Sequence, residues 1–149
     1  MTRDRIAPPA GSYRVVVFLV RDEALVPVPR RVKAQPTPAD VLRTLSAGPT
    51  AQERSEGFRS ALPVDDDPEV LRTVDDIVTL NVPSTAESSN RTDAVLGFAQ
   101  LVLTLTSLPS VTGVAFEDNG RSLQVPRADG SLSTEPLARV DYRDLIDPA

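Results

Sequence analysis

The longest run without a charged residue extends over Ala94–Phe116, in a chain of which 25% of residues are charged. Its first part places apolar side chains on several turns of a 3.6-residue period, which predicts a helix of about 14 residues that is buried around most of its circumference. Ser107–Ser110 ends this helix, and Val111–Phe116 predicts a strand. Because Pro109 and Gly113 interrupt the run, we interpret it as a core helix and a strand rather than as a membrane span. The apolar helix positions are Leu96, Phe98, Ala99, Leu101, Val102, Leu103 and Leu105.

Two strands are predicted near the N-terminus. Tyr13–Val20 is an almost continuous β-branched and apolar run, which is typical of a central strand buried on both faces. A turn at residues 21–24 leads to Leu25–Val32, which we expect to pair back on the first strand. Pro27 and Pro29 are two positions apart, so both missing N–H groups lie along the same edge. Leu25–Val32 is therefore predicted to be an edge strand whose prolines block further pairing.

Two capping boxes flank a helix stop in the next segment. Thr37–Asp40 combines a threonine cap, a proline at the first helical position and an acid three residues after the cap. Gly48 and Pro49 end this helix, because glycine accepts the left-handed conformation and proline cannot continue a helix. Thr50–Glu53 has the pattern of a second capping box, which opens a short helix. The apolar stripe of the first helix consists of Val41, Leu42 and Leu45.

The rest of the chain predicts hairpins. Glu69–Val74 and Ile77–Val82 have the composition of two strands joined by a turn at Asp75–Asp76. Glu117–Gly120 is a hairpin turn that leads to a return strand over Leu123–Val125. The remaining expected features are a loop over residues 83–90, a cap of the main helix at Asn90 or Thr92, a turn over residues 128–131 and a docking turn over Pro136–Leu145.

These elements predict a single α+β domain over residues 13–149, in which a mixed or antiparallel β-sheet packs against two main helices. Residues 1–12, with their prolines and glycine, are expected to be a flexible N-terminal lead-in. The length of 149 residues fits one domain.

Composition excludes several classes of function. The net charge of −5 argues against a nucleic-acid partner, because phosphate neutralisation needs a basic surface. The chain has no Cys and no His, so thiolate or imidazole ligands and bases are absent. A serine nucleophile would need Lys33 or a carboxylate as its base, and neither a nucleophile motif nor a phosphate-binding glycine loop occurs. We therefore expect no enzyme, no cofactor and no metal.

A few charged clusters remain as candidates. Asp65–Asp67 concentrates oxygen ligands suited to calcium, but it lacks the alternating spacing of an EF-hand, and a solvated acidic turn is the main interpretation. Asp75–Asp76 and Glu117–Asp118 fit turn chemistry. Arg30 and Arg31 could contact an anionic polymer or a protein partner, or could simply form an exposed charged strand end.

The string Leu45–Glu53, with its Gly-Pro-Thr centre, is followed by Gly57–Pro63, and together they resemble the GerMN domain. That domain occurs in sporulation and spore-germination proteins and in actinobacterial lipoproteins. The resemblance covers about residues 13–126, and the tail over Pro136–Tyr142 resembles actinobacterial members. Supporting pieces are Pro27–Arg31, Gln100–Thr104, Val111–Phe116, Asn119–Gly120 and Val125–Pro126.

The resemblance implies an extracytoplasmic α/β domain of a membrane-anchored cell-envelope lipoprotein, whose lipid anchor lies outside this sequence. Its implied role is protein interaction, assembling with or modulating an envelope complex, with no catalytic residues to transfer. The alternative is a domain that binds a cell-wall polymer or a small ligand. Sporulation members tend to carry two such domains in tandem and this sequence has one, so a ring-forming role is not implied and a homo-oligomer stays open.

The candidate interaction residues are Arg30, Arg31, Gly48, Pro49 and Thr50. For Gly48–Thr50 the main interpretation is structural, because these residues stop one helix and start the next. The partner, the process served and the presence of a signal segment with a lipid-attachment cysteine in the precursor are left open by the sequence.

Overall fold

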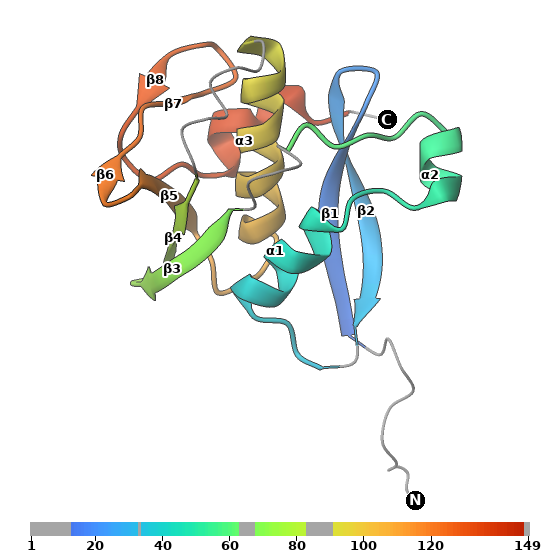
Figure 1. The fold of residues 1–149 in the computed structure, drawn as a ribbon, viewed down its shortest axis with the longest axis horizontal. Coiled ribbons are helices and arrows are strands. Elements are labelled where there is room, and N and C mark those ends of the chain that lie inside the picture. The colour runs from blue at the N-terminus through green and yellow to red at the C-terminus, as the bar shows by residue number, and fades with distance from the viewer. Residues whose placement is uncertain (1–12, 33, 63–67, 83–90, 148–149) are drawn as a thin grey trace, which may run out of the picture.

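The computed structural model describes residues 13–32, 34–62, 68–82 and 91–147 (Figure 1). The expected lead-in over residues 1–12 and the expected loop over residues 83–90 lie outside the described residues. The elements are β1 (Tyr13–Arg21), β2 (Ala24–Val32), α1 (Pro38–Ser46), α2 (Ala51–Ser55), β3 (Glu69–Val74), β4 (Ile77–Asn81), α3 (Arg91–Thr106), β5 (Gly113–Asp118), β6 (Arg121–Ser122), β7 (Val125–Pro126), β8 (Leu132–Ser133) and the 3₁₀ helix η2 (Arg139–Leu145).

Helix α3 stands between the β1–β2 hairpin and a larger sheet (Figure 1). The larger sheet has the strand order β3-β4-β5-β6, and it is mixed because β4 and β5 are parallel while its other neighbours are antiparallel. A parallel pair requires a crossover connection, and α3 lies in that connection. A short antiparallel pair, β7–β8, follows. The predicted α+β class, with a mixed sheet packed against two main helices, is confirmed.

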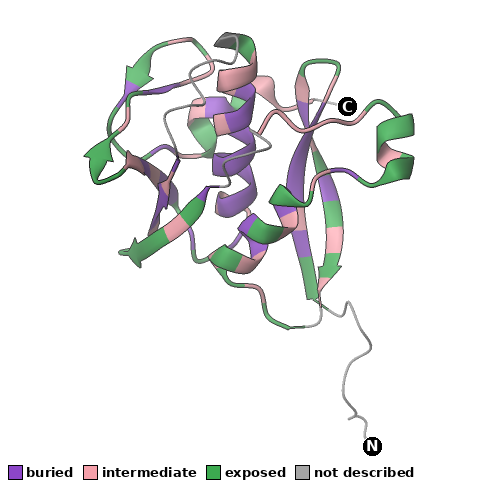
Figure 2. Ribbon diagram, in the orientation of Figure 1, coloured by how far each residue is buried: buried purple, intermediate pink, exposed green. Residues whose placement is uncertain are grey.

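The core is centred on α3, which is buried along most of its length (Figure 2). Phe98 of α3 meets Phe116 of β5 edge to face, with the ring centroids 5.0 Å apart. Gly97 allows a close approach of the chain at Ala61, since a Cβ atom there would lie 3.1 Å from the Ala61 carbonyl oxygen. Within the described ranges no helix has the length and apolar character needed to cross a membrane. The buried apolar residues of α3 are Leu96, Ala99, Leu101, Val102, Leu103 and Leu105.

Three polar side chains at helical spacing face β1, and we call Gln100, Thr104 and Ser107 the polar stripe. The Phe18 N–H donates to Thr104 Oγ1 at 2.9 Å, and Gln100 Nε2 donates to the Phe18 carbonyl oxygen at 3.0 Å. Ser107 Oγ lies 3.3 Å from the Val16 carbonyl oxygen, to which it can donate. Gln100 and Thr104 are fully buried. The polar stripe therefore supplies hydrogen-bond partners to backbone groups of β1 on the edge that faces away from β2.

The prediction of a central strand over Tyr13–Val20 is half right. Both faces of β1 are buried over most of its length, as predicted. Its place at the centre of a sheet is wrong, because β1 has β2 as its strand partner on one side and the polar stripe on the other. Beyond the stripe, Val20 and Arg59 exchange two backbone hydrogen bonds of 2.8 Å. An apolar run does not reveal whether a strand or a helix supplies the hydrogen bonds at its edge.

The edge position of β2 is confirmed. Pro27 lies opposite Phe18 and Pro29 lies two positions further along the same strand. Since the Phe18 backbone groups bond on the side away from β2, the Phe18–Pro27 pair is not hydrogen-bonded, and the proline nitrogens face outward. Among the described residues only an isolated bridge meets this outer edge, where Asp147 N–H donates to the Leu25 carbonyl oxygen at 2.8 Å.

The three predicted hairpin turns are confirmed. Asp22–Glu23, Asp75–Asp76 and Asn119–Gly120 each carry two consecutive residues with positive φ. That geometry is the type I′ turn, whose twist matches the twist of antiparallel strands.

Several predicted boundaries shift. The strand expected over Val111–Phe116 begins at Gly113 and ends at Asp118. Of the return strand expected over Leu123–Val125, only Val125 lies in a strand, β7, and the strand that pairs back on β5 is β6 instead. Thr92 lies inside α3 and is not its cap, while Asn90 lies outside the described residues. The expected docking turn over Pro136–Leu145 contains η2, with Leu137 and Tyr142 buried.

We expect Thr104→Val to lower the free energy of unfolding by about 1–3 kcal/mol, because it leaves the buried Phe18 N–H without an acceptor at nearly unchanged volume. Urea unfolding followed by circular dichroism measures the change. Thr106→Val is the matched control, since Thr106 Oγ1 donates only to carbonyl groups of its own helix. Equal stability of Thr104→Val and the unaltered protein would show that β1 does not need the hydrogen bond from the polar stripe at its second edge.

Candidate functional site

The loop between α1 and α2 forms the first candidate site. Gly48 follows α1 with φ +77° and donates its N–H to the Leu45 carbonyl oxygen at 3.0 Å, so it is the predicted left-handed helix stop. A Cβ atom at Gly48 would meet nothing within 4 Å, so the backbone angle, not space, favours glycine here. Pro49 is buried, and Thr50 caps α2 by accepting the Glu53 N–H on its Oγ1 at 3.1 Å.

Glu53 connects this loop to the β1–β2 hairpin. Arg30 NH1 donates to Glu53 Oε2 at 2.8 Å, and Arg30 NH2 donates to Glu53 Oε1 at 2.7 Å. The same Oε1 accepts the Thr50 N–H at 2.9 Å, which completes the capping box. The side chains of Arg30 and Glu53 are 20% and 17% exposed. One carboxylate therefore holds the end of β2 and the start of α2 together.

The charge of Glu53 is stabilised by these contacts. The hydrogen bonds from Arg30 hold the pKa of the Glu53 carboxyl below its ordinary value of 4.5, partial burial opposes them, and the Thr50 N–H adds to the lowering. The carboxylate thus stays ionised and paired with Arg30 at neutral pH.

The structure brings four of the five predicted site residues together and leaves one out. Arg30 is joined through Glu53 to the loop of Gly48, Pro49 and Thr50. Arg31 is next to Arg30 in β2, and successive strand side chains point to opposite faces, so Arg31 points away from Glu53. An interaction role for these residues stays a prediction. From the sequence, Glu53 is predicted only as a helix-capping residue. Its contact with Arg30 was not predicted, because nothing in the spacing of the two residues indicates it.

A second feature lies along β3, which pairs with β4 on one side and ends the larger sheet. Leu71 is 41% exposed and Val74 is 58% exposed. A groove of about 520 Å³ separates β3 from α1. Leu42 and Val70 are the aliphatic residues of its lining, which also contains Ala39, Arg43, Ser46, Pro68, Glu69 and Asn81.

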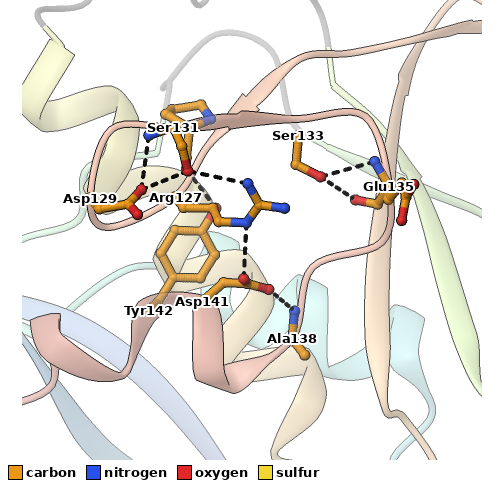
Figure 3. A network of polar contacts seen from close by, with 9 residues as sticks. Arg127, Asp129, Ser131, Ser133, Glu135, Ala138, Asp141 and Tyr142 are labelled. Atoms are coloured by element: carbon orange, nitrogen blue, oxygen red, sulfur yellow. Dashed lines mark hydrogen bonds and ion pairs between the residues drawn. The ribbon is translucent and has the colours of Figure 1, made fainter.

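A polar network fixes the C-terminal segment (Figure 3). Arg127 Nε donates to Asp141 Oδ1 at 3.0 Å, and Asp141 Oδ2 accepts the Ala138 N–H at 2.8 Å. The Tyr142 hydroxyl donates to the Pro126 carbonyl oxygen at 2.7 Å, and burial raises the pKa of this phenol well above its ordinary value. Ser131 and Asp129 extend the network, while Ser133 and Glu135 bond beside it. The ionised pair thus holds the segment after β7 in place.

The charged residues within the described ranges offer ion pairs and hydrogen bonds. Those ranges hold no group of three or more acidic side chains that could bind a metal. Asp65–Asp67, the predicted calcium alternative, and Lys33, the base considered for a serine nucleophile, both lie outside the described residues.

Comparison with known proteins gives a family and a fold. The family model Germane, described as sporulation and spore germination, matches residues 14–124. The tandem GerMN domains of the sporulation protein GerM from Bacillus subtilis share 18% identity at a TM-score of 0.67, covering 87% of this chain and 47% of that chain. This chain thus spans about half of the tandem structure. No curated protein matches the sequence significantly.

Two further solved structures match over nearly their whole lengths. The first GerMN domain of the same Bacillus subtilis protein has a TM-score of 0.64 and 20% identity, covering 87% of this chain and 99% of that chain. A candidate lipoprotein from Clostridium perfringens has a TM-score of 0.56 and 15% identity, covering 93% of this chain and 95% of that chain. At these identities the likeness is one of fold.

We expect Glu53→Gln to lower the free energy of unfolding by roughly 1–3 kcal/mol at pH 7, because it removes the charge that Arg30 and Thr50 contact. The folded-state pKa of Glu53 is lowered, so its stabilising contribution is complete above pH 4.5 and declines as the pH falls through the folded-state value. The difference between the variant and the unaltered protein should therefore shrink in acid. Urea unfolding at pH 7 and pH 3 measures both effects.

The matched control for this experiment is Glu56→Gln, which removes an exposed carboxylate from the end of the same helix. We expect it to change stability by less than about 0.5 kcal/mol. A difference between Glu53→Gln and the unaltered protein that is as large at pH 3 as at pH 7 would contradict the ion-pair account.

Proposed function

The chain belongs to the Germane family of sporulation and spore germination, and on that premise we propose that it is a non-catalytic, extracytoplasmic interaction domain of a cell-envelope lipoprotein. In this role it assembles with, or modulates, a protein complex of the envelope. The fold likeness to a candidate lipoprotein, which covers 95% of that chain, supports the proposed location. The lipid anchor would be supplied by a part of the precursor outside this sequence.

The observation that carries a protein-binding role is the exposed edge of β3. Among the described residues no strand pairs with its outer side, and Leu71 and Val74 present apolar surface there. The groove between α1 and β3 lies beside this edge, with Leu42 and Val70 in its lining. An exposed strand edge with apolar side chains next to a groove is a common site for peptide or protein docking.

The form of the edge favours recognition through side chains. The register shifts between Val70 and Arg72, so Leu71 is the extra residue of a β-bulge. Bulges disrupt the ladder and oppose unselective strand addition. A partner would therefore be held by Leu71, Val74 and the groove rather than by a long backbone ladder.

The alternative function is binding of a cell-wall polymer or small ligand, for which Arg30 and Arg31 are the predicted contacts. Arg30 is paired with both carboxylate oxygens of Glu53, and a ligand anion would have to compete with that pair. Arg31, on the opposite face, is not subject to this competition with Glu53.

We expect a photo-crosslinking amino acid at Val74 to give an adduct of one defined size with an envelope protein in cells of the source organism. Val140 is the matched control, because this second valine is 62% exposed and lies on η2 instead of β3. Val74→Lys should reduce recovery of the partner at least roughly tenfold, as loss of an apolar anchor does, and Val140→Lys should not. Adducts of the same kind from both positions, or none from Val74, would refute the β3 surface.

The location has its own test. We expect the full-length gene product to fractionate with membranes and to be accessible to protease added outside intact cells. Recovery of the full-length product in the cytosolic fraction, protected from that protease, would overturn the envelope assignment irrespective of the crosslinking result.

A further inference from the structure

A second groove, of about 360 Å³, lies at the open end of the β1–β2 hairpin. Tyr13 and Arg14 line it from β1, Gln35 from the segment before α1, and Ser110 from the segment after α3. All four of these residues are exposed. The volume falls within the range of small-ligand sites, which is roughly 300–1,000 Å³.

The polar groups of this groove are suited to an anion. Among the described residues its lining contains no Asp and no Glu, although the whole chain has a net charge of −5. The Arg14 guanidinium has no ion-pair partner among the described residues, in contrast to Arg30, Arg59, Arg72 and Arg127. The Gln35 amide and the Ser110 hydroxyl add hydrogen-bond donors. A positively charged group and neutral donors thus line one groove without a competing carboxylate.

The register of the hairpin increases the local positive charge. Arg14 lies directly opposite Arg31, so both side chains emerge on the same face. Hydrogen-bonded and non-hydrogen-bonded residue pairs alternate along an antiparallel hairpin, and Phe18–Pro27 is a non-hydrogen-bonded pair. Arg14–Arg31, four positions away, is therefore also non-hydrogen-bonded, and the Cβ atoms of such pairs are roughly 4.5–5.5 Å apart. Arg14 and Arg31 thus place two positively charged side chains on the same face of the hairpin. Arg14 is thus the cross-strand neighbour of Arg31, which is one of the interaction residues predicted from the sequence.

We propose that this groove binds an anionic, hydroxyl-rich ligand, a phosphate- or carboxylate-bearing polyol or saccharide, whose anionic group is held by Arg14. The hydroxyl groups of such a ligand match Gln35 and Ser110, which donate and accept hydrogen bonds. Tyr13, which is 41% exposed, offers an aromatic face and a hydroxyl at the rim. Neutral amide and hydroxyl groups beside a single unpaired arginine suit a polyhydroxylated anion better than a densely charged acidic peptide.

This inference develops the alternative of the proposed function, the polymer or ligand binder, and assigns it residues. It does not require the protein partner at β3, because the two grooves share no lining residue. Failure of the test below therefore leaves the β3 surface standing, and failure of the crosslinking at Val74 leaves this groove standing.

The test measures binding of the purified full chain to poly(glycerol phosphate), to polygalacturonate and to neutral dextran, by calorimetry at low and at high salt. We expect one or both polyanions to bind, more weakly at high salt, and dextran not to bind. Arg14→Ala should weaken binding about tenfold, which corresponds to about 1.4 kcal/mol. Arg121→Ala is the control, because it removes the same charge from an exposed arginine on β6 that lines neither groove.

Binding of one polyanion alone supports the proposal and identifies the anionic group. Equal losses in Arg14→Ala and Arg121→Ala would show that the effect comes from net charge alone and would overturn the proposal. Polyglutamate that binds as tightly, with the same dependence on Arg14, would assign the groove to acidic peptides and overturn it as well. As a readout independent of any variant, titration with glycerol phosphate should shift the amide NMR signals of Tyr13, Gln35 and Ser110, and shifts confined to other residues would contradict the site.

Discussion

The fold depends on how the second edge of β1 obtains its hydrogen bonds. This strand is buried on both faces and pairs with a single strand, so its outward N–H and C=O groups would be left without partners in the core. Gln100 and Thr104 contact both backbone groups of Phe18, from a helix whose other buried side chains are apolar. Because leaving a buried backbone group unpaired costs about 1–3 kcal/mol, these contacts fix the position of α3 against the hairpin.

Hydrogen bonding along the strand edges also determines which edges of the molecule stay open. The outer edge of β2 carries Pro27 and Pro29, which have no N–H to donate. The outer edge of β1 is covered by α3. The larger sheet is different, because β3 ends it with Leu71 and Val74 exposed beside the groove against α1. The proposed protein partner would therefore dock at β3, which has exposed apolar side chains and lacks the prolines of β2.

Several arginines hold distant segments together. Arg30 connects the end of β2 to α2 through Glu53, and Arg127 connects the segment after β7 to η2 through Asp141. Arg59 contacts both Glu23 in the first hairpin turn and Asp93 in α3. Arg14 forms no such pair among the described residues, and the ligand-binding inference uses it because it lines the second groove.

The sequence by itself determined the elements whose causes are local. The caps of α1 and α2, the Gly48 stop, the hairpin turns and the proline edge follow from residue types a few positions apart, and the structure has all of these. Only the tertiary structure decided that a helix supplies the hydrogen bonds at the second edge of β1, that Arg30 pairs with Glu53, and that Arg14 lies opposite Arg31. Phe18 and Thr104 are 86 positions apart, and contacts over such separations depend on how whole elements dock. Docking is set by the sum of many burial and hydrogen-bonding terms, and no short spacing in the chain encodes that sum.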